Sequence, residues 1–360
     1  MTKEQRRSPR QRPRDQLPRK PSSWDIAREA AVSQSTVSRV LNNSPRISDA
    51  TTRRVLEAAE RLGYAPNAAA RTLITGKSNL IGLVVSNITN AFYPQVIDAV
   101  VATAAEHDYN VVLCNTKEDR ELQSSYLQLL IEHQVDGAIL TSSLLDSQSL
   151  FDKVRMDRIP LVLVNRTVPN LAADSVHLDN QGAGRIVAEH LAKLGHRHLA
   201  FVGGLEPTST NANRLRGFRD TLASLGIELP DERVVHGQFT RESGYALARR
   251  LIGLTPRPTA FFCADDEVAL GAMDAIIDAG LTIPGDIAVV GVDDTPAAAL
   301  RQVSLTTVRQ PATEMGRRAM ELLLERIRNG AGGDYIEIVL RPRLIVRKTC
   351  GGGTDRKSVV

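Results

Sequence analysis

A regular alternation of short apolar runs with helical stretches after residue 80 constrains the fold most strongly. The segments between the runs carry side chains at helical spacing, as in Leu122, Tyr126, Leu129 and Leu130. Alternation of strands and helices is typical of parallel sheets covered by helices on both faces. We therefore predict an α/β core with strands at residues 80–86, 110–115, 137–141, 160–165, 198–203, 233–237, 259–264 and 286–291.

Composition removes several classes of protein. A hydrophobic share of 42% with 24% charged residues excludes wholesale disorder. Cys114, Cys263 and Cys350 form no CxxC pair, which argues against a disulfide framework and a cysteine zinc site. His196 and His198 have no third ligand near them in sequence, so we expect no metal and no cofactor. Since no apolar run suits a membrane span or a signal peptide, we expect a cytoplasmic protein without a membrane partner.

Motifs of common enzymes are absent from the sequence. No GxGxxG follows an expected strand, and neither GxSxG nor HExxH occurs. The triplet Gly76-Lys77-Ser78 does not complete a phosphate-binding loop, because Arg71 stands where that loop requires its first glycine. An aromatic share of 4% also disfavours an RNA binder that stacks bases. We therefore expect a protein that is not an enzyme.

The charge of the chain is concentrated at its start. Residues 1–20 hold eight Lys or Arg against two Asp or Glu and almost no apolar side chain, so we expect a disordered basic tail. One interpretation is a solvated tail without a function. The other is an arm whose positive charge attracts DNA phosphates in a salt-dependent way.

Residues 21–65 predict three short helices. Ser22 can cap the first helix, with Asp25 three positions later. Ser33 can cap the second helix and Ser48 the third, which should end at Gly63. The apolar residues expected to pack inside this unit are Ile26, Ala27, Ala30, Val37, Val40, Leu41, Val55, Leu56, Ala59 and Leu62.

The second expected helix sorts its side chains into an apolar face and a polar face. Arginine pairs with guanine, glutamine with adenine and serine with either base, so the polar face suits the base edges of the major groove. Two short helices joined by a tight turn and supported by a third are typical of a helix-turn-helix, which is all-α. The polar face holds Gln34, Ser35, Ser38, Arg39 and Asn42.

The run from Asp25 to Asn42, DIAREAAVSQSTVSRVLN, closely resembles the DNA-binding head of the lactose-repressor (LacI) family of bacterial transcription regulators. One departure is Ala31, where the family usually has a glycine that accepts a positive φ freely. The resemblance implies that Gln34, Ser35 and Arg39 read bases, and that Ser33, Thr36, Ser38 and Asn42 contact phosphate or brace the helix.

Residues 66–78 resemble the hinge helix of the same family. Three consecutive alanines favour helix, but so short a segment is unstable alone in water. The resemblance implies that it pairs with its dimer mate in the minor groove at Ala70 and Leu73, with Leu73 as a wedge between base steps. The alternative is an ordinary linker with an incidental leucine.

The resemblance extends from Ser22 to about Lys348 and implies a two-lobed core over residues 79–348, followed by a flexible tail over 349–360. The family's core looks like periplasmic sugar-binding proteins, with two parallel sheets, three crossovers and the ligand between the lobes. By analogy the crossovers should lie near Leu163, Asp294 and Asn329.

Polar and aromatic side chains follow several expected strands, where ligands of open parallel sheets bind. Asp266 and Asp294 are expected to cap helices instead. Asp265 stands where the family often has asparagine, which should disfavour an acidic effector unless Arg166 and Arg214 compensate. Arg214 stands where the family commonly has its effector-binding arginine. The predicted effector contacts are Phe92, Arg166, Arg214, Phe239, Asp265 and Asp293.

The sequence thus predicts a DNA-binding regulator, expected to be a repressor, that acts as a homodimer on double-stranded, pseudopalindromic operator DNA. A dimer is favoured because the end of the chain lacks the leucine-repeat helix of the family's tetramers. The expected effector is a sugar or sugar derivative. The alternatives are a regulator with a nucleobase-type corepressor, a soluble ligand-binding protein of the sugar-binding class, and an enzyme on the same scaffold.

Overall fold

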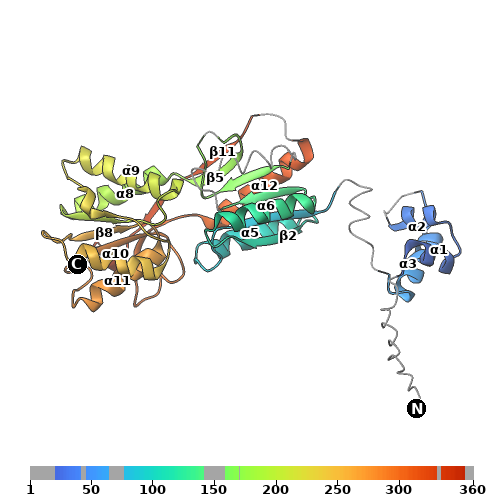
Figure 1. The fold of residues 1–360 in the computed structure, drawn as a ribbon, viewed down its shortest axis with the longest axis horizontal. Coiled ribbons are helices and arrows are strands. Elements are labelled where there is room, and N and C mark those ends of the chain that lie inside the picture. The colour runs from blue at the N-terminus through green and yellow to red at the C-terminus, as the bar shows by residue number, and fades with distance from the viewer. Residues whose placement is uncertain are drawn as a thin grey trace, which may run out of the picture. The chain divides into compact units, whose positions relative to one another are not determined.

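The computed structural model describes residues 21–41, 46–64, 77–141, 159–169, 171–330 and 334–352. The chain divides into two compact units, Met1–Gly76 and Lys77–Val360 (Figure 1). We call them the head and the core. The predicted tail over residues 1–20 and the hinge residues Ala70 and Leu73 lie outside the described residues.

The head contains three helices, α1 (Ser23–Glu29), α2 (Gln34–Leu41) and α3 (Asp49–Arg61). All three begin where the caps predict. The Asp25 carboxylate accepts from the backbone nitrogen of Ser22 at 2.9 Å, and the Ser33 and Ser48 hydroxyls accept from the nitrogens three residues on. Ala31 between α1 and α2 has φ +47°, the left-handed conformation expected from the glycine that the family usually has at this position.

The interior of the head is a small apolar cluster built from one face of each helix. It contains Ile26, Ala27, Ala30, Val37, Val40, Val55, Ala58 and Ala59. Leu56 was expected inside, but its side chain is 51% exposed and Ala58 is buried instead. Because a helix has 3.6 residues per turn, Ala58 and Ala59 lie on the same face of α3 as the buried Val55, whereas Leu56 points away from that face.

The core has two lobes, each built on a six-stranded sheet. The first sheet has the strand order β11-β5-β4-β3-β1-β2 and is parallel throughout its described pairings. Helices α5 and α12 cover one face and α6 covers the other, so the strands are apolar on both sides. The elements are β1 (Leu80–Val85), α5 (Tyr93–Ala105), β2 (Asn110–Asn115), α6 (Arg120–Glu132), β3 (Gly137–Leu140), β4 (Leu161–Val164), β5 (Asp174–Leu178), α12 (Ala312–Asn329) and β11 (Glu337–Leu340).

The second sheet has the order β12-β10-β9-β8-β6-β7, with α8 and α9 on one face and α10 and α11 on the other. Its edge strand β12 pairs antiparallel with β10, which corrects the expectation of two purely parallel sheets. The elements are α8 (Asn180–Lys193), β6 (Leu199–Val202), α9 (Ser209–Ser224), the 3-10 turn η1 (Asp231–Arg233), β7 (Val234–Val235), α10 (Arg241–Ile252), β8 (Ala260–Cys263), α11 (Asp266–Asp278), β9 (Ala288–Asp293), β10 (Thr306–Arg309), β12 (Arg343–Ile345) and the 3-10 turn η2 (Lys348–Cys350).

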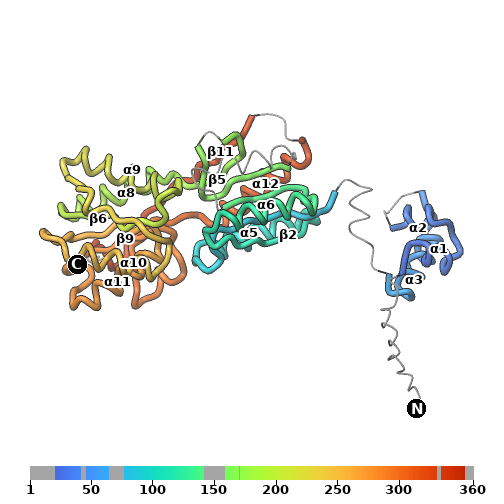
Figure 2. Tube along the Cα trace, in the orientation of Figure 1, coloured from blue at the N-terminus to red at the C-terminus, as the bar shows by residue number. Residues whose placement is uncertain are grey.

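The element order and the strand orders show that the chain passes between the lobes three times. Figure 2 traces the chain through both lobes. The crossovers lie between β5 and α8, between β10 and α12, and between β11 and β12. The positions expected near Leu163, Asp294 and Asn329 are therefore wrong. In each case an unpredicted strand, β5, β10 or β11, adds to the sheet of the same lobe before the chain leaves it.

The C-terminal tail was expected to begin at residue 349, but Thr349 and Cys350 are buried in the second lobe. The Thr349 hydroxyl donates to the Val289 carbonyl at 2.7 Å and accepts from the Thr306 nitrogen at 2.8 Å. These bonds fasten η2 to the sheet, so the ordered core extends beyond Lys348.

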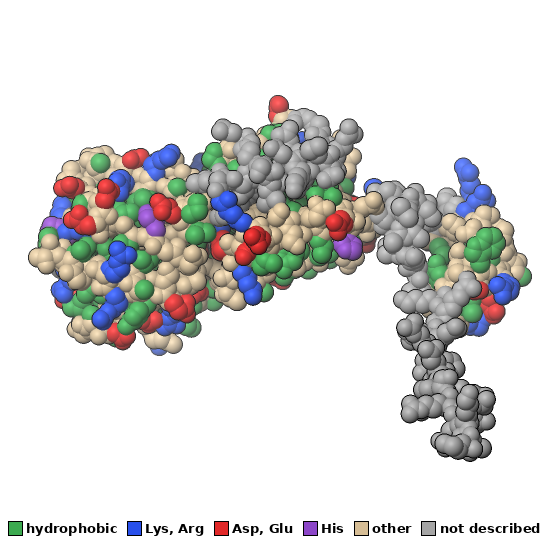
Figure 3. Space-filling model, in the orientation of Figure 1, with side chains coloured by type: hydrophobic (Ala, Val, Ile, Leu, Met, Phe, Trp, Pro, Cys, Tyr) green, Lys and Arg blue, Asp and Glu red, His purple; other side chains and the backbone are tan. Residues whose placement is uncertain are grey.

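No helix that the structure describes is long and apolar enough to cross a membrane. On the face of the core drawn in Figure 3, acidic and basic side chains are interspersed.

Candidate functional site

A cavity of about 120 Å³ lies between the two lobes, at the carboxyl ends of the strands. Its walls come from the first lobe through the segments after β1, β2 and β4. The second lobe contributes α9, the last residue of β9 and the segments after β7, β8 and β10. The structure brings together all six residues predicted to contact an effector: Phe92, Arg166, Arg214, Phe239, Asp265 and Asp293. Their role in binding stays a prediction.

Phe92 and Tyr93 form the aromatic wall of the first lobe. They meet edge to face with ring centroids 5.2 Å apart at the start of α5, and both are buried. Asn165 directly after β4 has φ +67°, and its amide nitrogen donates to the Tyr93 hydroxyl at 3.4 Å. The wall thus combines two rings with an amide group.

Arg214 lies within α9, and the close packing of two helices sets its position. Gly184 of α8 and Gly217 of α9 lie where a Cβ atom would collide with the backbone of the opposite helix. The Arg214 Nε donates to the Asn180 Oδ1 at 2.8 Å, and Nη1 donates to the Ala264 carbonyl. Burial lowers the pKa of Arg214, an effect that nearby carboxylates oppose.

Arg166 is held by Glu118 on one side and Phe239 on the other. Two hydrogen bonds of 2.7 Å join its Nη1 and Nη2 to the two carboxylate oxygens of Glu118. Its guanidinium carbon lies 5.3 Å from the centroid of the Phe239 ring, a cation–π distance across the lobes. Burial alone would lower the pKa of Arg166, but the attraction of Tyr93 and Glu118 raises it.

Asp265 and Asp293 bring two carboxylates to the second lobe's side of the cavity. Asp265 accepts from the Val268 backbone nitrogen at 2.8 Å and from the Asn90 amide of the first lobe at 2.9 Å. Asp293 accepts from the Gln310 amide. Burial raises the pKa of both carboxyl groups, and their mutual repulsion raises that of Asp293 further.

Four buried polar atoms of cavity residues have no hydrogen-bond partner within the described structure. They are Nε of Arg166, Nη2 of Arg214, Oδ1 of Asn165 and Oε1 of Gln310. A buried polar atom without a partner is unfavourable, so a ligand that donates and accepts hydrogen bonds would be stabilised here. The two donors, the two acceptors and the carboxylates of Asp265 and Asp293 match several hydroxyl groups on one small molecule.

The prediction of six contacts missed part of the cavity wall. Lys117 and Glu118 follow the predicted strand β2, so the strand-end rule could have found them. Gln310 follows β10, which was not predicted as a strand. The remaining lining residues outside the six are Asn87, Asn90, Tyr93, Asn165, Thr210, Gln238 and Thr240.

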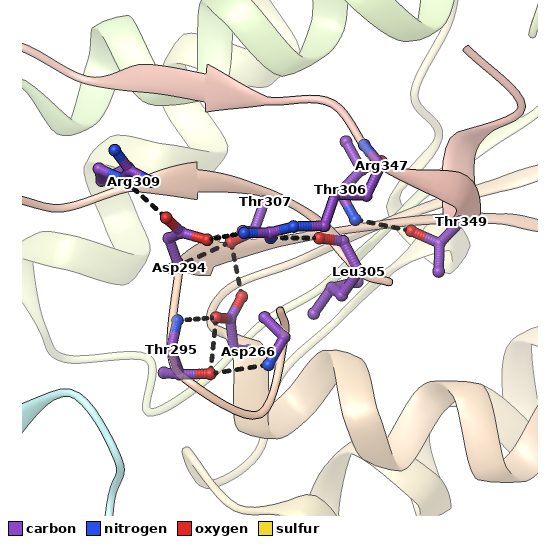
Figure 4. Close-up of polar contacts among 10 residues, drawn as sticks. Asp266, Asp294, Thr295, Leu305, Thr306, Thr307, Arg309, Arg347 and Thr349 are labelled. Atoms are coloured by element: carbon purple, nitrogen blue, oxygen red, sulfur yellow. Dashed lines mark hydrogen bonds and ion pairs between the residues drawn. The ribbon is translucent and has the colours of Figure 1, made fainter. Parts of the chain in front are cut away.

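Asp266 and Asp294 do not cap helices, contrary to expectation. Asp265 caps α11. Asp266 is fully buried and accepts from Thr295 and Thr307, whereas Asp294 forms ion pairs with Arg309 and Arg347 (Figure 4). For Asp266 the prediction failed by one residue, because Asp265 is the N-cap and Asp266 is the first residue of α11.

The predicted DNA-reading residues lie on α2. Ser35 and Arg39 are exposed, and Gln34 is half-buried with its amide 3.4 Å from the Ser23 hydroxyl. Ser33 is occupied in capping α2, while Thr36 and Ser38 are half-buried on the same helix, and Asn42 lies outside the described residues. Trp24, 68% exposed, shares a surface groove with Gln34 and Ser35 and was not predicted.

No group of three or more His, Cys, Asp or Glu side chains in the described part of the chain could hold a metal ion. The cavity wall offers two guanidinium groups, the Lys117 ammonium group, three carboxylates, amides and rings.

Comparison with family models matches both units. Residues 24–67 match the family of bacterial regulatory proteins named lacI, and residues 188–350 match a periplasmic binding protein-like domain. Catabolite control protein A of Priestia megaterium is 34% identical over 83% of this chain and 90% of its own length. The HTH-type transcriptional repressor PurR of Photobacterium profundum is 32% identical over 90% of this chain and 97% of its own.

Solved structures resemble the chain over most of its length. The transcriptional regulator CelR in complex with cellobiose is 32% identical, with a TM-score of 0.71 over 91% of this chain and 99% of that one. The Lac repressor dimer bound to operator and the anti-inducer ONPF is 27% identical, with a TM-score of 0.81 over 92% of this chain and 99% of that one.

Proposed function

This chain belongs to the LacI family of bacterial regulatory proteins, and from that premise we propose that an uncharged, hydroxyl-rich effector controls its repression of transcription. The chain is a DNA-binding transcription regulator with an effector-binding core. Its relatives are regulators rather than enzymes, and we expect no turnover of the bound effector.

The observation that carries the effector proposal is the composition of the cavity wall. Arg214, Asp265 and Asp293 of the second lobe face Phe92 and Arg166 of the first, and unpartnered polar atoms line the space between. Hydroxyl groups can donate to the carboxylates and accept from the guanidinium, while the rings cover an apolar face. A sugar or sugar derivative has this pattern, and the similar CelR structure holds cellobiose.

A nucleobase-type corepressor is the second candidate. The Phe92 and Phe239 rings favour it, because a flat heterocycle can stack on an aromatic side chain. The guanidinium of Arg166 already occupies one face of Phe239, which leaves less of that ring for stacking.

The regulatory mechanism follows from the position of the cavity. Asn90 bonds to Asp265 across the lobes at 2.9 Å, and the Thr167 nitrogen donates to the Ser209 hydroxyl at 2.8 Å. The two lobes can be arranged in more than one way relative to each other. A ligand that contacts both lobes shifts the equilibrium between two such arrangements by the difference in its affinity for them. We propose that this change reaches the operator through residues 66–78.

We also propose that the chain acts as a homodimer on a pseudopalindromic operator. Two heads that read two half-sites require two-fold symmetry, and the similar Lac repressor structure is a dimer on its operator.

A thermal-shift screen of the purified protein against sugars, sugar acids, polyols and nucleobases tests the effector proposal. A ligand at 100 times its Kd stabilises the protein by about 2.7 kcal/mol, whatever its effect on DNA. We expect a saturable response to an uncharged polyol, and its loss in Asp293→Ala and Arg214→Ala. Asp231→Ala, which removes an exposed carboxylate outside the cavity, should respond like the wild type.

The DNA half of the proposal is measured separately, by selecting sites from random duplexes. We expect a two-fold symmetric site whose affinity changes when the polyol is added. A protein that selects its operator but responds to nucleobases alone would favour the corepressor. A full polyol response in both cavity variants would refute the assignment of the site.

A further inference from the structure

Arg166 brings a positive charge into the cavity wall, but that charge is already neutralised within the protein. Its side chain is 3% exposed and forms the two-bond ion pair with Glu118, whose side chain is 15% exposed. Paired, parallel N–H···O bonds are the strongest arrangement that an arginine and a carboxylate can form. A ligand therefore meets Arg166 as a flat, compensated group rather than as a free cation.

The whole cavity is balanced in the same way. Its basic side chains are Lys117, Arg166 and Arg214, and its acidic ones are Glu118, Asp265 and Asp293, so the formal charges cancel. An anionic ligand would add repulsion to Asp265 and Asp293, whose pKa values burial already raises. A hydroxyl group, by contrast, stabilises a buried carboxylate by donating a hydrogen bond to it.

Glu118 is also fixed in place by its backbone. It lies after β2 with φ +63°, and its nitrogen donates to the Ser86 carbonyl at 3.0 Å. A ligand carboxylate or phosphate could form the two-bond pair with Nη1 and Nη2 of Arg166 only by displacing this carboxylate, which would leave a buried charge without a partner. The protein's own anion is therefore a permanent competitor for the Arg166 site. The Nε of Arg166, which has no partner among the described residues, remains as a single donor for an uncharged acceptor.

We propose that Glu118 sets the charge selectivity of the effector cavity: by pairing with Arg166 it excludes anionic ligands, such as sugar phosphates and sugar acids, and favours uncharged polyols. This inference rests on the proposed role of the cavity as the effector site. Glu118 is a specificity-determining residue that acts through Arg166.

The test replaces Glu118→Gln in the full chain and titrates inorganic phosphate by calorimetry, with sodium chloride holding ionic strength constant. The amide keeps the size of the side chain but leaves Arg166 with an uncompensated charge. We expect at least a tenfold gain in phosphate affinity over the wild type. Glu121→Gln makes the same charge change on an exposed side chain of α6 outside the cavity, and it should give no gain.

A second comparison identifies Arg166 as the source of the gain. The double variant Glu118→Gln/Arg166→Gln has a neutral pair and should again bind phosphate as weakly as the wild type. If Glu118→Gln does not fold, Glu118→Ala leaves the same charge on Arg166 and space beside it, and it should show the same gain.

Two results would overturn the proposal. One is wild-type protein that binds phosphate as tightly as the variant. The other is a folded variant that unfolds at a lower temperature but gains no phosphate affinity, since a purely structural ion pair predicts that outcome. Operator selection and the polyol thermal shift of the wild type test the proposed function independently, so either idea can fail without the other.

Discussion

Asp266, the first residue of α11, is a fully buried carboxyl group that follows Asp265 of the cavity wall. It accepts from the backbone nitrogen and hydroxyl of Thr295 at 2.8 and 3.0 Å, and from the Thr307 hydroxyl at 2.6 Å. No basic side chain forms an ion pair with it among the described residues. Burial raises its pKa to about 7. The hydrogen bonds from Thr307 and Thr295 lower this pKa, and the repulsion from Asp265 raises it.

This raised pKa predicts that stability decreases as the pH rises. Because the folded protein holds the proton more tightly than the unfolded chain, whose Asp pKa is about 3.9, stability is lost between pH ~4 and ~7. The pKa shift of this group corresponds to roughly 4 kcal/mol of the free energy of unfolding. The free energy of unfolding, measured with denaturant across this pH range, should decrease less steeply with pH in Asp266→Asn than in the wild type.

The control for this prediction is Asp231→Asn, an exposed carboxylate on η1, which should keep the wild-type slope. Asp265 and Asp293 have pKa values shifted in the same direction and should leave part of the slope in Asp266→Asn. An unchanged slope in that variant would mean that Asp266 is ionised in the folded protein at low pH.

The turn between α1 and α2 contains a residue with a Cβ atom in the left-handed conformation. Ala31 has φ +47°, and a left-handed conformation is unfavourable for a residue with a Cβ by roughly 1–2 kcal/mol. Glycine removes that strain but gains entropy in the unfolded chain, which offsets part of the benefit. We expect Ala31→Gly to stabilise the head by about 0.5–1 kcal/mol.

Trp24 provides the measurement for this variant. It is the only tryptophan of the chain and lies in the head, so its fluorescence follows the unfolding of the head within the intact protein. Ala30→Gly is the matched control, because Ala30 is buried with φ −84° and should lose stability. Equal or lower stability of Ala31→Gly would show that the turn is not strained.

The helices of the head could be predicted because their signals are local. Ser22, Ser33 and Ser48 mark the helix starts by hydrogen bonds that span three residues. Strand β10 could not be predicted in this way, because Thr306 and Thr307 look like exposed residues but are fully buried. Their hydroxyls find partners that are distant in sequence, and only the folded sheet shows those partners.

The contrast between local signals and contacts distant in sequence also separates the cavity residues that could be predicted from those that could not. Phe92, Asp265 and Asp293 follow apolar strands, so the rule for ligand sites in parallel sheets identified them. The pairing of Glu118 with Arg166 could not be predicted, because β2 and β4 are separated in the sheet by β1 and β3. Which two strand ends meet across a cavity depends on strand order, which the sequence does not state locally.

At the scale of the whole molecule, the proposed homodimer requires that the core connect two chains as well as two lobes. Strand β2 is the last strand of the first sheet, and an edge strand leaves backbone groups open to pairing. Leu113 on this strand is 46% exposed, and Val101 on the contacting helix α5 is 44% exposed. Exposed apolar side chains on this edge strand and on the helix that contacts it favour this surface as part of the proposed dimer interface.

Leu113→Lys should therefore weaken the dimer. A charged side chain on a solvent-exposed edge is compatible with folding, but burying it against a partner is unfavourable. Light scattering should show the wild type at about twice its chain mass of 39.2 kDa and the variant shifted toward a single chain. Leu225→Lys, at an exposed leucine that follows α9, should stay dimeric.

This variant also separates the two halves of the regulatory cycle. The cavity is built within one chain, so the polyol thermal shift of Leu113→Lys should match that of the wild type. Operator affinity should decrease at least tenfold, because a single head contacts only one half-site. A monomer that retained full operator affinity would mean that the heads recognise DNA independently, and effector closure of the core could not then act through the pairing of two chains.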